Sequence, residues 1–390
     1  MKKILVILLA LVFCMSLSAA CASGSVAPPP AASSPVVPAV SNSPAPETSV
    51  SPAPAVLNSP APSEPATVSF TDDAGRTVDI PSPSTITKMA PSGAVAQMYL
   101  MAIAPDLLGT IAASYADSDA KYILPSILSL PIVGQFYGSG DLNYESIASL
   151  APQLVIDIGE PKGTVVEDMD SISTNIGIPA IHITATTQNT PDVFRTLGKL
   201  LGREDRGEQI AAFCEMVLSQ TDDIMAKVGD NKARVLLCVG NDGLNVIANG
   251  SYQASTLDYV TNNLAVVDSP SAKGTGNETD LEQITLWNPD VILFGPDAIY
   301  STVATDPAWN NLEAISSGAY YEMPAGPYKW LCNPPSINIY LGLIWLPKVL
   351  YPDYAAYDLF SEVQQYYNLF YGYNLTQADF DALTANSLPK

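Results

Sequence analysis

The chain has little positive charge and a single histidine, His182. Its 390 residues contain 17 Lys and Arg against 39 Asp and Glu, which gives a formal net charge of -22. This acidity argues against binding to nucleic acid or to anionic lipid headgroups, because both need a basic surface. One histidine also excludes a zinc site built from several histidines.

The sequence lacks the motifs of common exported enzymes. A hydrolase with a Ser-His-Asp or Cys-His arrangement would have to use His182, which lies in a predicted strand. No Gly-x-Ser-x-Gly sequence, metal-ligand cluster or phosphate-binding loop accompanies it. We therefore expect a protein without catalytic residues, bound metal or cofactor, in which His182 is structural.

Cysteines are also few. Once Cys14 and Cys21 near the N-terminus are set aside, three remain: Cys214, Cys238 and Cys332. An odd number without motif spacing does not indicate a disulfide framework, even for an exported protein. We expect buried free thiols.

The N-terminus has the organisation of an export signal. Lys2 and Lys3 precede an apolar stretch at 4–15, which is too short for a membrane-spanning helix. The small residues before Cys21 resemble a bacterial lipoprotein processing site, with Ser18 where leucine is usual. The resemblance implies a signal peptide at 1–21, lipid attachment at Cys21, and a protein anchored to the outer face of the cytoplasmic membrane or facing the periplasm in a two-membrane cell. An ordinary secretory signal with an incidental cysteine is the alternative.

A proline-rich segment follows at 22–66. It holds twelve of the 33 prolines, interleaved with Ala, Ser and Val. Such a composition cannot bury a core and favours extended polyproline-II segments of about 3 Å per residue. We interpret it as a tether between the membrane and the folded region.

The folded region has the pattern of an α/β protein. Residues 68–78 alternate around a turn and predict a hairpin. Short apolar runs then alternate with helical stretches, at 131–134, 154–156, 178–183, 235–239 and 291–294. Short buried strands that alternate with helices are typical of parallel sheets.

A long helix lies near the middle of this region. Thr190 and Pro191 mark a helix start, Gly202 weakens the pattern, and apolar residues then recur at helical spacing up to Val228. We expect one long helix over about 203–228. It divides the folded region into an N-terminal lobe at 67–202, a bridging helix at 203–229 and a C-terminal lobe at 230–390.

An internal repeat flanks that helix. Residues 145–156 and 282–293 align without gaps, so that Glu145 matches Glu282 and Pro152 matches Pro289. Each copy predicts a short helix with an acidic first turn, a stop before proline, and a buried strand. Two copies favour two similar parallel-sheet α/β lobes joined by one long helix, with a ligand cleft between them.

The folded region resembles a known family: the lipid-anchored or periplasmic substrate-binding proteins of ABC importers for ferric siderophores, haem and cobalamin. The order and spacing of several segments carry the resemblance: 70–76, 131–134, both repeat units, 197–203 and 345–352. It implies a monomeric receptor that delivers a metal chelate to an ABC permease and its ATPase. It also implies that Glu145 and Glu282 dock onto arginines of the permease; as residues alone, both are first-turn acids that stabilise a helix.

Ligands of open α/β sheets bind at the carboxyl ends of the strands. The side chains expected there could stack on a macrocycle or chelator, or ligate ferric iron through oxygen. Each could equally pack against the core, as we expect for the tyrosines between 351 and 373. The candidates are Tyr115, Phe136, Tyr137, Glu160, Asn241, Tyr252, Tyr328 and Trp330.

The shortage of arginine bears on the ligand. Strongly acidic siderophores usually meet guanidinium groups, which bind carboxylates with two parallel hydrogen bonds. No arginine lies at the predicted strand ends, and the lysines there are Lys121, Lys162, Lys273 and Lys329. This favours a neutral or cationic chelate, a corrinoid, haem or another metal complex. An oxyanion such as molybdate, held by helix N-termini, stays open, as does a ligand sensor or adhesin on the same scaffold.

Overall fold

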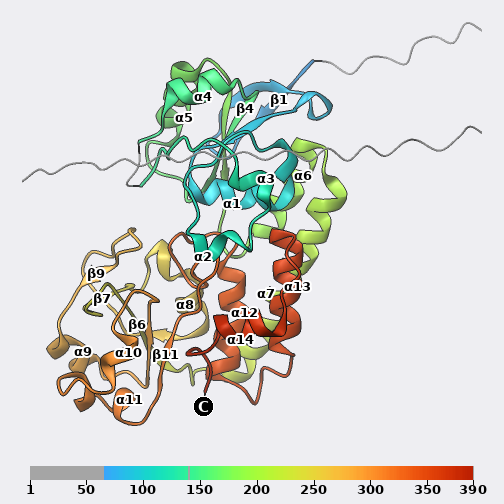
Figure 1. Cartoon of the computed structure of the whole chain (residues 1–390). Coiled ribbons are helices and arrows are strands. Elements are labelled where there is room, and N and C mark those ends of the chain that lie inside the picture. Colours follow the sequence, from blue (N-terminus) through green and yellow to red (C-terminus); the bar gives the residue numbers. More distant parts are fainter. Residues whose placement is uncertain (1–65, 139–140, 390) are drawn as a thin grey trace, which may run out of the picture. The chain divides into compact units, whose positions relative to one another are not determined.

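An antiparallel hairpin opens the folded region of the computed structural model (Figure 1), as the alternating pattern predicts. Strand β1 (Thr67–Thr71) pairs with β2 (Thr77–Pro81), and the carboxylate of Asp72 closes the turn by accepting from the backbone N–H of Arg76 at 2.9 Å. The structure describes residues 66–138 and 141–389. The predicted signal peptide, Cys21 and the tether up to residue 65 lie outside the described residues.

The N-terminal lobe contains a parallel three-stranded sheet in the order β3-β4-β5. Its central strand β4 is buried along its whole length, which explains its continuous apolar run. Residues 131–134 form no strand, only an isolated bridge between Ile111 and Ile132. The elements are β3 (Met89–Pro91), α1 (Ala94–Ile103), α2 (Asp117–Ala120), α3 (Pro125–Leu128), α4 (Tyr144–Leu150), β4 (Leu154–Gly159), α5 (Val165–Ile176) and β5 (Ala180–Thr184), with single 3-10 turns at Pro83–Thr85 and Pro105–Leu107.

Two antiparallel helices follow, α6 (Thr190–Leu201) and α7 (Glu204–Val228). Gly202 ends α6 in the left-handed conformation with φ 63°, so the break and the long helix lie where the sequence predicts them. The helices pack closely at Gly207, where an added Cβ would lie 2.6 Å from the carbonyl oxygen of Phe194.

The C-terminal lobe contains a mixed sheet rather than the expected parallel one. Strands β6, β8, β10 and β11 run parallel, but β7 and β9 pair antiparallel in the order β11-β10-β6-β7-β9, with β8 also on β6. The tight turn between β6 and β7 is too short for a crossover helix, so β7 has to return antiparallel. The elements are β6 (Arg234–Val239), β7 (Asn245–Val246), α8 (Ser255–Val260), β8 (Asn262–Asn263), β9 (Asn277–Glu278), α9 (Leu281–Trp287), β10 (Val291–Phe294), α10 (Tyr300–Val303), α11 (Glu313–Ser316) and β11 (Tyr320–Glu322), with 3-10 turns at Tyr252–Ala254 and Trp309–Asn311.

Three further helices end the chain: α12 (Ile339–Leu350), α13 (Leu359–Tyr371) and α14 (Gln377–Leu383), drawn in red in Figure 1. α12 packs on α7 and α8, and α13 packs on α12 and on α1 of the N-terminal lobe. One hydrophobic core therefore runs from Leu154 of β4 through Phe213 of α7 to Val235 of β6 and Trp345 of α12.

Both copies of the internal repeat have the predicted structure. Asn143 caps α4 by accepting from the N–H of Ser146 at 2.9 Å, and Asp280 caps α9 by accepting from Gln283 at 2.8 Å. Each helix then ends at a left-handed residue before the proline and the buried strand. The structure of each copy therefore follows from residues within that copy.

The cysteines and most C-terminal tyrosines are buried, as expected. Cys214, Cys238 and Cys332 are free thiols. Tyr366 stacks on Phe370, and Tyr367 and Tyr371 make edge contacts in the same buried cluster. Tyr354 is an exception, since it lies in the turn after α12 and is 43% exposed. Within 66–138 and 141–389, no helix is long and apolar enough to cross a membrane.

Candidate functional site

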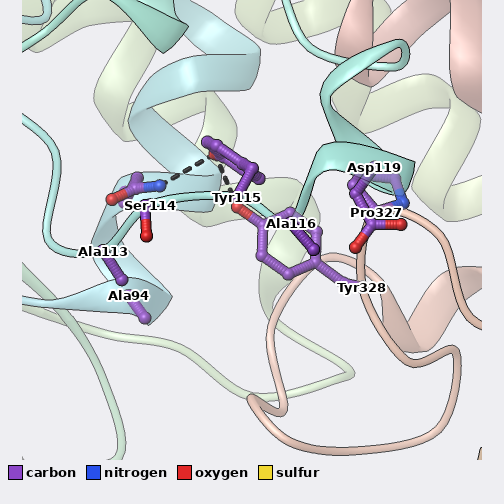
Figure 2. Close-up of a pocket in the computed structure, with 9 residues that line it drawn as sticks. Ala94, Ala113, Ser114, Tyr115, Ala116, Asp119, Pro327 and Tyr328 are labelled. Atoms are coloured by element: carbon purple, nitrogen blue, oxygen red, sulfur yellow. Dashed lines mark hydrogen bonds between the residues drawn. The ribbon is translucent and has the colours of Figure 1, made fainter. Parts of the chain in front are cut away.

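A small cavity lies between the N-terminal lobe and the loop after β11 (Figure 2). Its volume is about 190 Å³, and it lies where the loops leave the carboxyl ends of the parallel strands. The lining residues are Ala94, Gln97, Ala113, Ser114, Tyr115, Ala116, Asp119, Pro327 and Tyr328. Of the eight predicted ligand-binding residues, the cavity brings together Tyr115 and Tyr328.

The two tyrosines meet through their hydroxyl groups. The phenolic oxygens of Tyr115 and Tyr328 lie 2.7 Å apart, although the residues are 213 positions apart in the chain. Their rings make an edge contact with centroids 5.9 Å apart. The dashed lines in Figure 2 mark this bond and the one that Gln97 makes to Tyr115.

Gln97 positions Tyr115 from inside α1. The side chain is buried, and its carbonyl oxygen accepts from the N–H of Ala112 at 2.5 Å. Its amide nitrogen donates to the Tyr115 hydroxyl at 2.8 Å. The amide therefore ties the 111–116 loop to α1 at both ends, which fixes the direction of the phenol.

The loop that carries Tyr328 is held by the C-terminal helices. The hydroxyl of Tyr367 donates to the carbonyl of Gly326, and the amide of Asn338 donates to the carbonyl of Lys329. The ring of Tyr328 also packs on Tyr371, with centroids 6.4 Å apart. Both walls of the cavity are thus preorganised by buried hydrogen bonds.

Burial raises the pKa of Tyr115 and of Tyr328, mainly through loss of solvation. Both side chains are therefore neutral phenols at neutral pH. In this state they offer hydrogen bonds to a ligand rather than phenolate oxygen to a metal ion.

The other predicted residues lie outside the cavity lining, and each has another environment. The hydroxyl of Tyr137 donates to Asp168 at 2.7 Å, and its ring contacts Phe136. Glu160 pairs with Lys162 at 2.7 Å. The sequence does not show these partners, because they depend on side-chain direction in loops.

The remaining candidates lie in the C-terminal lobe. Tyr252 donates to the carbonyl of Ala185, the residue after β5, at 3.0 Å, so it also links the two lobes. Asn241 is exposed. Trp330 is fully buried in the core, where it packs rather than faces the cavity.

Sequence reasoning missed Asp119, the one carboxylate in the cavity lining. It lies on α2, four residues after Tyr115, in the segment 115–119 with the sequence Tyr-Ala-Asp-Ser-Asp. Following that loop beyond Tyr115 would have found it. Gln97 was missed because a buried polar residue of a helix gives no sequence signal of its partners.

His182 belongs to a buried network within the N-terminal sheet. Its Nδ1 lies 2.6 Å from Asp157 of β4, and its Nε2 lies 3.2 Å from the hydroxyl of Thr184. The hydroxyl of Ser92 donates to Asp157, not to His182. These contacts order the strand ends and do not form a nucleophile–base pair.

Comparison with known proteins agrees with this geometry. The profile of the family described as "Periplasmic binding protein" matches residues 98–327, more than half of the chain. The chain belongs to the periplasmic binding protein family. The match includes Tyr115 and Asp119 of the cavity lining and ends one residue before Tyr328. The family resemblance inferred from the repeat and its flanking segments is confirmed.

Individual relatives are transport proteins. This periplasmic binding protein is 25% identical over 219 residues, 55% of its length and 67% of the relative's, to the Fe(3+)-citrate-binding protein YfmC of Bacillus subtilis (strain 168). It is 26% identical to the ABC transporter solute binding protein of Sulfurospirillum deleyianum DSM 6946, with a TM-score of 0.75 over 81% of this chain and 99% of that one.

More distant structures share the fold. The molybdate periplasmic binding protein MolA of Haemophilus influenzae is 18% identical, with a TM-score of 0.61 over 79% of this chain and 99% of that one. The family and these neighbours are binding proteins of transporters rather than enzymes. The predicted α/β fold with parallel sheets is confirmed, apart from the antiparallel strands β7 and β9.

Proposed function

We propose that this protein is the extracytoplasmic receptor of an ABC importer, which captures a metal chelate and delivers it to the permease and its ATPase. The supporting observation is the cavity walled by Tyr115 and Tyr328, from sequence-distant loops of a periplasmic binding protein. Ferric siderophores, haem and cobalamin are the ligand classes. We expect the receptor to be a monomer.

The test identifies the ligand directly. Native mass spectrometry of the purified full chain reports what co-purifies, and titration with haem, cobalamin, ferric chelates and molybdate then measures affinity. We expect binding of at least one chelate, weakened in a Tyr115→Phe, Tyr328→Phe double variant that keeps the rings but removes both hydroxyls. Absence of submillimolar binding to every compound would refute the receptor function.

We also propose that Cys21 carries the lipid anchor, with residues 22–66 as the tether. The support is the basic, apolar and small-residue order of 1–21 before that cysteine. A Cys21→Ser variant should leave the membrane fraction and lose incorporation of labelled fatty acid. Cys14→Ser is the matched control and should keep both; an equal loss in the two variants would contradict the assignment.

Finally, we propose that Glu145 and Glu282 dock the receptor onto basic residues of the permease. Both are exposed in the first turn of a short helix, and each helix is capped by the side chain of the residue before it, Asn143 or Asp280. Glu145 and Glu282 occupy equivalent positions in the two copies of the repeat, so each can bind one of two similar sites on the permease.

A further inference from the structure

The cavity carries a net negative charge. Of its nine lining side chains, Asp119 is the one that is ionised at neutral pH, since the tyrosines are neutral phenols and the others are small or amide side chains. No lysine, arginine or histidine belongs to this lining. An anionic ligand would thus meet a carboxylate and no countercharge.

The carboxylate of Asp119 has no hydrogen-bond or ion-pair partner among residues 66–138 and 141–389. The closest lysine in sequence, Lys121, instead binds Asp379 of α14 at 2.7 Å and lies over the ring of Tyr122. Asp119 is also partly buried, and its pKa is raised by loss of solvation. A partly desolvated carboxylate without a partner is stabilised by any cation that enters the cavity.

The lysines predicted at the strand ends supply no countercharge to the cavity lining. Lys162 and Lys329 are neutralised by Glu160 and Asp297, while the exposed Lys273 lies outside the cavity lining. The five arginines bind carboxylates or backbone carbonyls of the scaffold: Arg76, Arg195, Arg203, Arg206 and Arg234.

We propose that Asp119 is a specificity residue and that the cavity selects chelates presenting an ammonium or another positively charged group. This inference rests on the receptor function and names the charge class of its ligand. Tyr115 and Tyr328 complete the site, because the hydroxyl that accepts in their mutual hydrogen bond keeps its own proton to donate to an oxygen of a chelate, while Asp119 accepts from its cationic group. The cavity of about 190 Å³ holds such a group rather than a whole siderophore.

Two probes with the same metal centre test this. Ferrioxamine B is a ferric trihydroxamate with a free terminal ammonium, and its N-acetylated form is neutral. Titration of the full chain should show at least tenfold tighter binding of the ammonium form. In Asp119→Asn this preference should fall to within about twofold, while the affinity for the acetylated form stays the same.

Asp117→Asn is the matched control, since Asp117 lies on the same short helix, is exposed, and does not line the cavity. It should keep the wild-type preference. Equal affinity of the wild type for both forms, or an unchanged preference in Asp119→Asn, would overturn the role of Asp119.

Different results would refute the charge preference and the receptor function. Tighter binding of ferric dicitrate, haem or molybdate than of ferrioxamine B would overturn the charge preference and leave the receptor function intact. Failure of every probe to bind at submillimolar concentration would refute the receptor function itself.

Discussion

Two equivalent residues of the repeated helix–strand unit have a left-handed backbone. Ala151 ends α4 with φ 48°, and Asn288 ends α9 with φ 47°. This conformation costs an L-residue with a plain Cβ roughly 1–2 kcal/mol, whereas asparagine tolerates it through local hydrogen bonding. The two sites therefore differ in strain although their structures agree.

We expect Ala151→Gly to raise the free energy of unfolding by about 0.5–1 kcal/mol, because glycine removes the Cβ strain but has more freedom in the unfolded chain. Urea denaturation of the full chain measures the change. Asn288→Gly is the control and should change stability by less. A gain at Asn288 equal to that at Ala151 would contradict the strain argument.

The buried carboxylate of Glu362 makes the free energy of unfolding depend on pH. Glu362 accepts from Gln220 at 3.0 Å through one oxygen, while burial of the group raises its pKa. The folded protein thus holds this proton more tightly than the unfolded chain. The stabilisation that comes from this tighter proton binding is fully present below the pKa of Glu362 in the unfolded chain, about 4.3. It is lost as pH rises through the pKa of Glu362 in the folded protein.

Glu362→Gln should therefore raise the free energy of unfolding at pH 7, by about 1 kcal/mol, and change it little near pH 4. Denaturation at the two pH values checks this. Glu313→Gln, at an exposed helix position, is the control. Equal effects of Glu362→Gln at both pH values would show that its charge is not the cause.

The environment of a side chain in a loop is not visible in the sequence. Tyr115, Tyr328 and Trp330 are all expected at the cavity because each follows a predicted strand. Position along a strand end does not tell which way a side chain points, and Trp330 points into the core. Asp119 lies on a short helix and not directly after a predicted strand, so the same rule does not select it.

The packing of α6 on α7 depends on Gly207. Gly207→Ala would place a Cβ 2.6 Å from the carbonyl oxygen of Phe194, a backbone atom that cannot move alone. We expect the free energy of unfolding to fall by about 1–3 kcal/mol, since overpacking outweighs the better helix propensity of alanine.

Gly163→Ala is the control, because its added Cβ meets no atom within 4 Å. Gly163 lies in a turn, so denaturation of both variants separates the steric conflict at Gly207 from the general effect of replacing a glycine. Stabilisation by Gly207→Ala would show that the two helices can separate without cost.

Elements whose structure depends on nearby residues can be predicted from the sequence. The hairpin, the repeat and α7 follow from turns, caps and apolar spacing within a few residues of each element. The antiparallel strands β7 and β9 are two residues long and too short to give a periodic pattern. The packing of α12 and α13 on α7 and α1 depends on contacts far apart in the chain, which one sequence does not display.

Docking through Glu145 and Glu282 would make uptake depend on the charge of both residues. A Glu145→Arg, Glu282→Arg double variant should keep its affinity for the chelate and lose at least tenfold in uptake, because like charges would face the permease. Uptake of labelled chelate by cells and titration of the purified full chain measure the two quantities.

The matched control is Glu167→Arg, Glu313→Arg. These residues are also exposed in helix first turns, so the change of charge and the loss of helix stabilisation are the same. Uptake should stay near the wild-type level. Equal uptake by the two double variants would contradict docking through Glu145 and Glu282.

The continuous core has a mechanical consequence. Leu154, Phe213, Val235 and Trp345 belong to one buried cluster, so a wide separation of the lobes would expose apolar surface along their shared helices. We expect the empty and loaded receptors to have nearly the same radius of gyration. If the receptor function proposed above holds, a permease would then have to distinguish them by local changes at the ligand site rather than by a large closing motion.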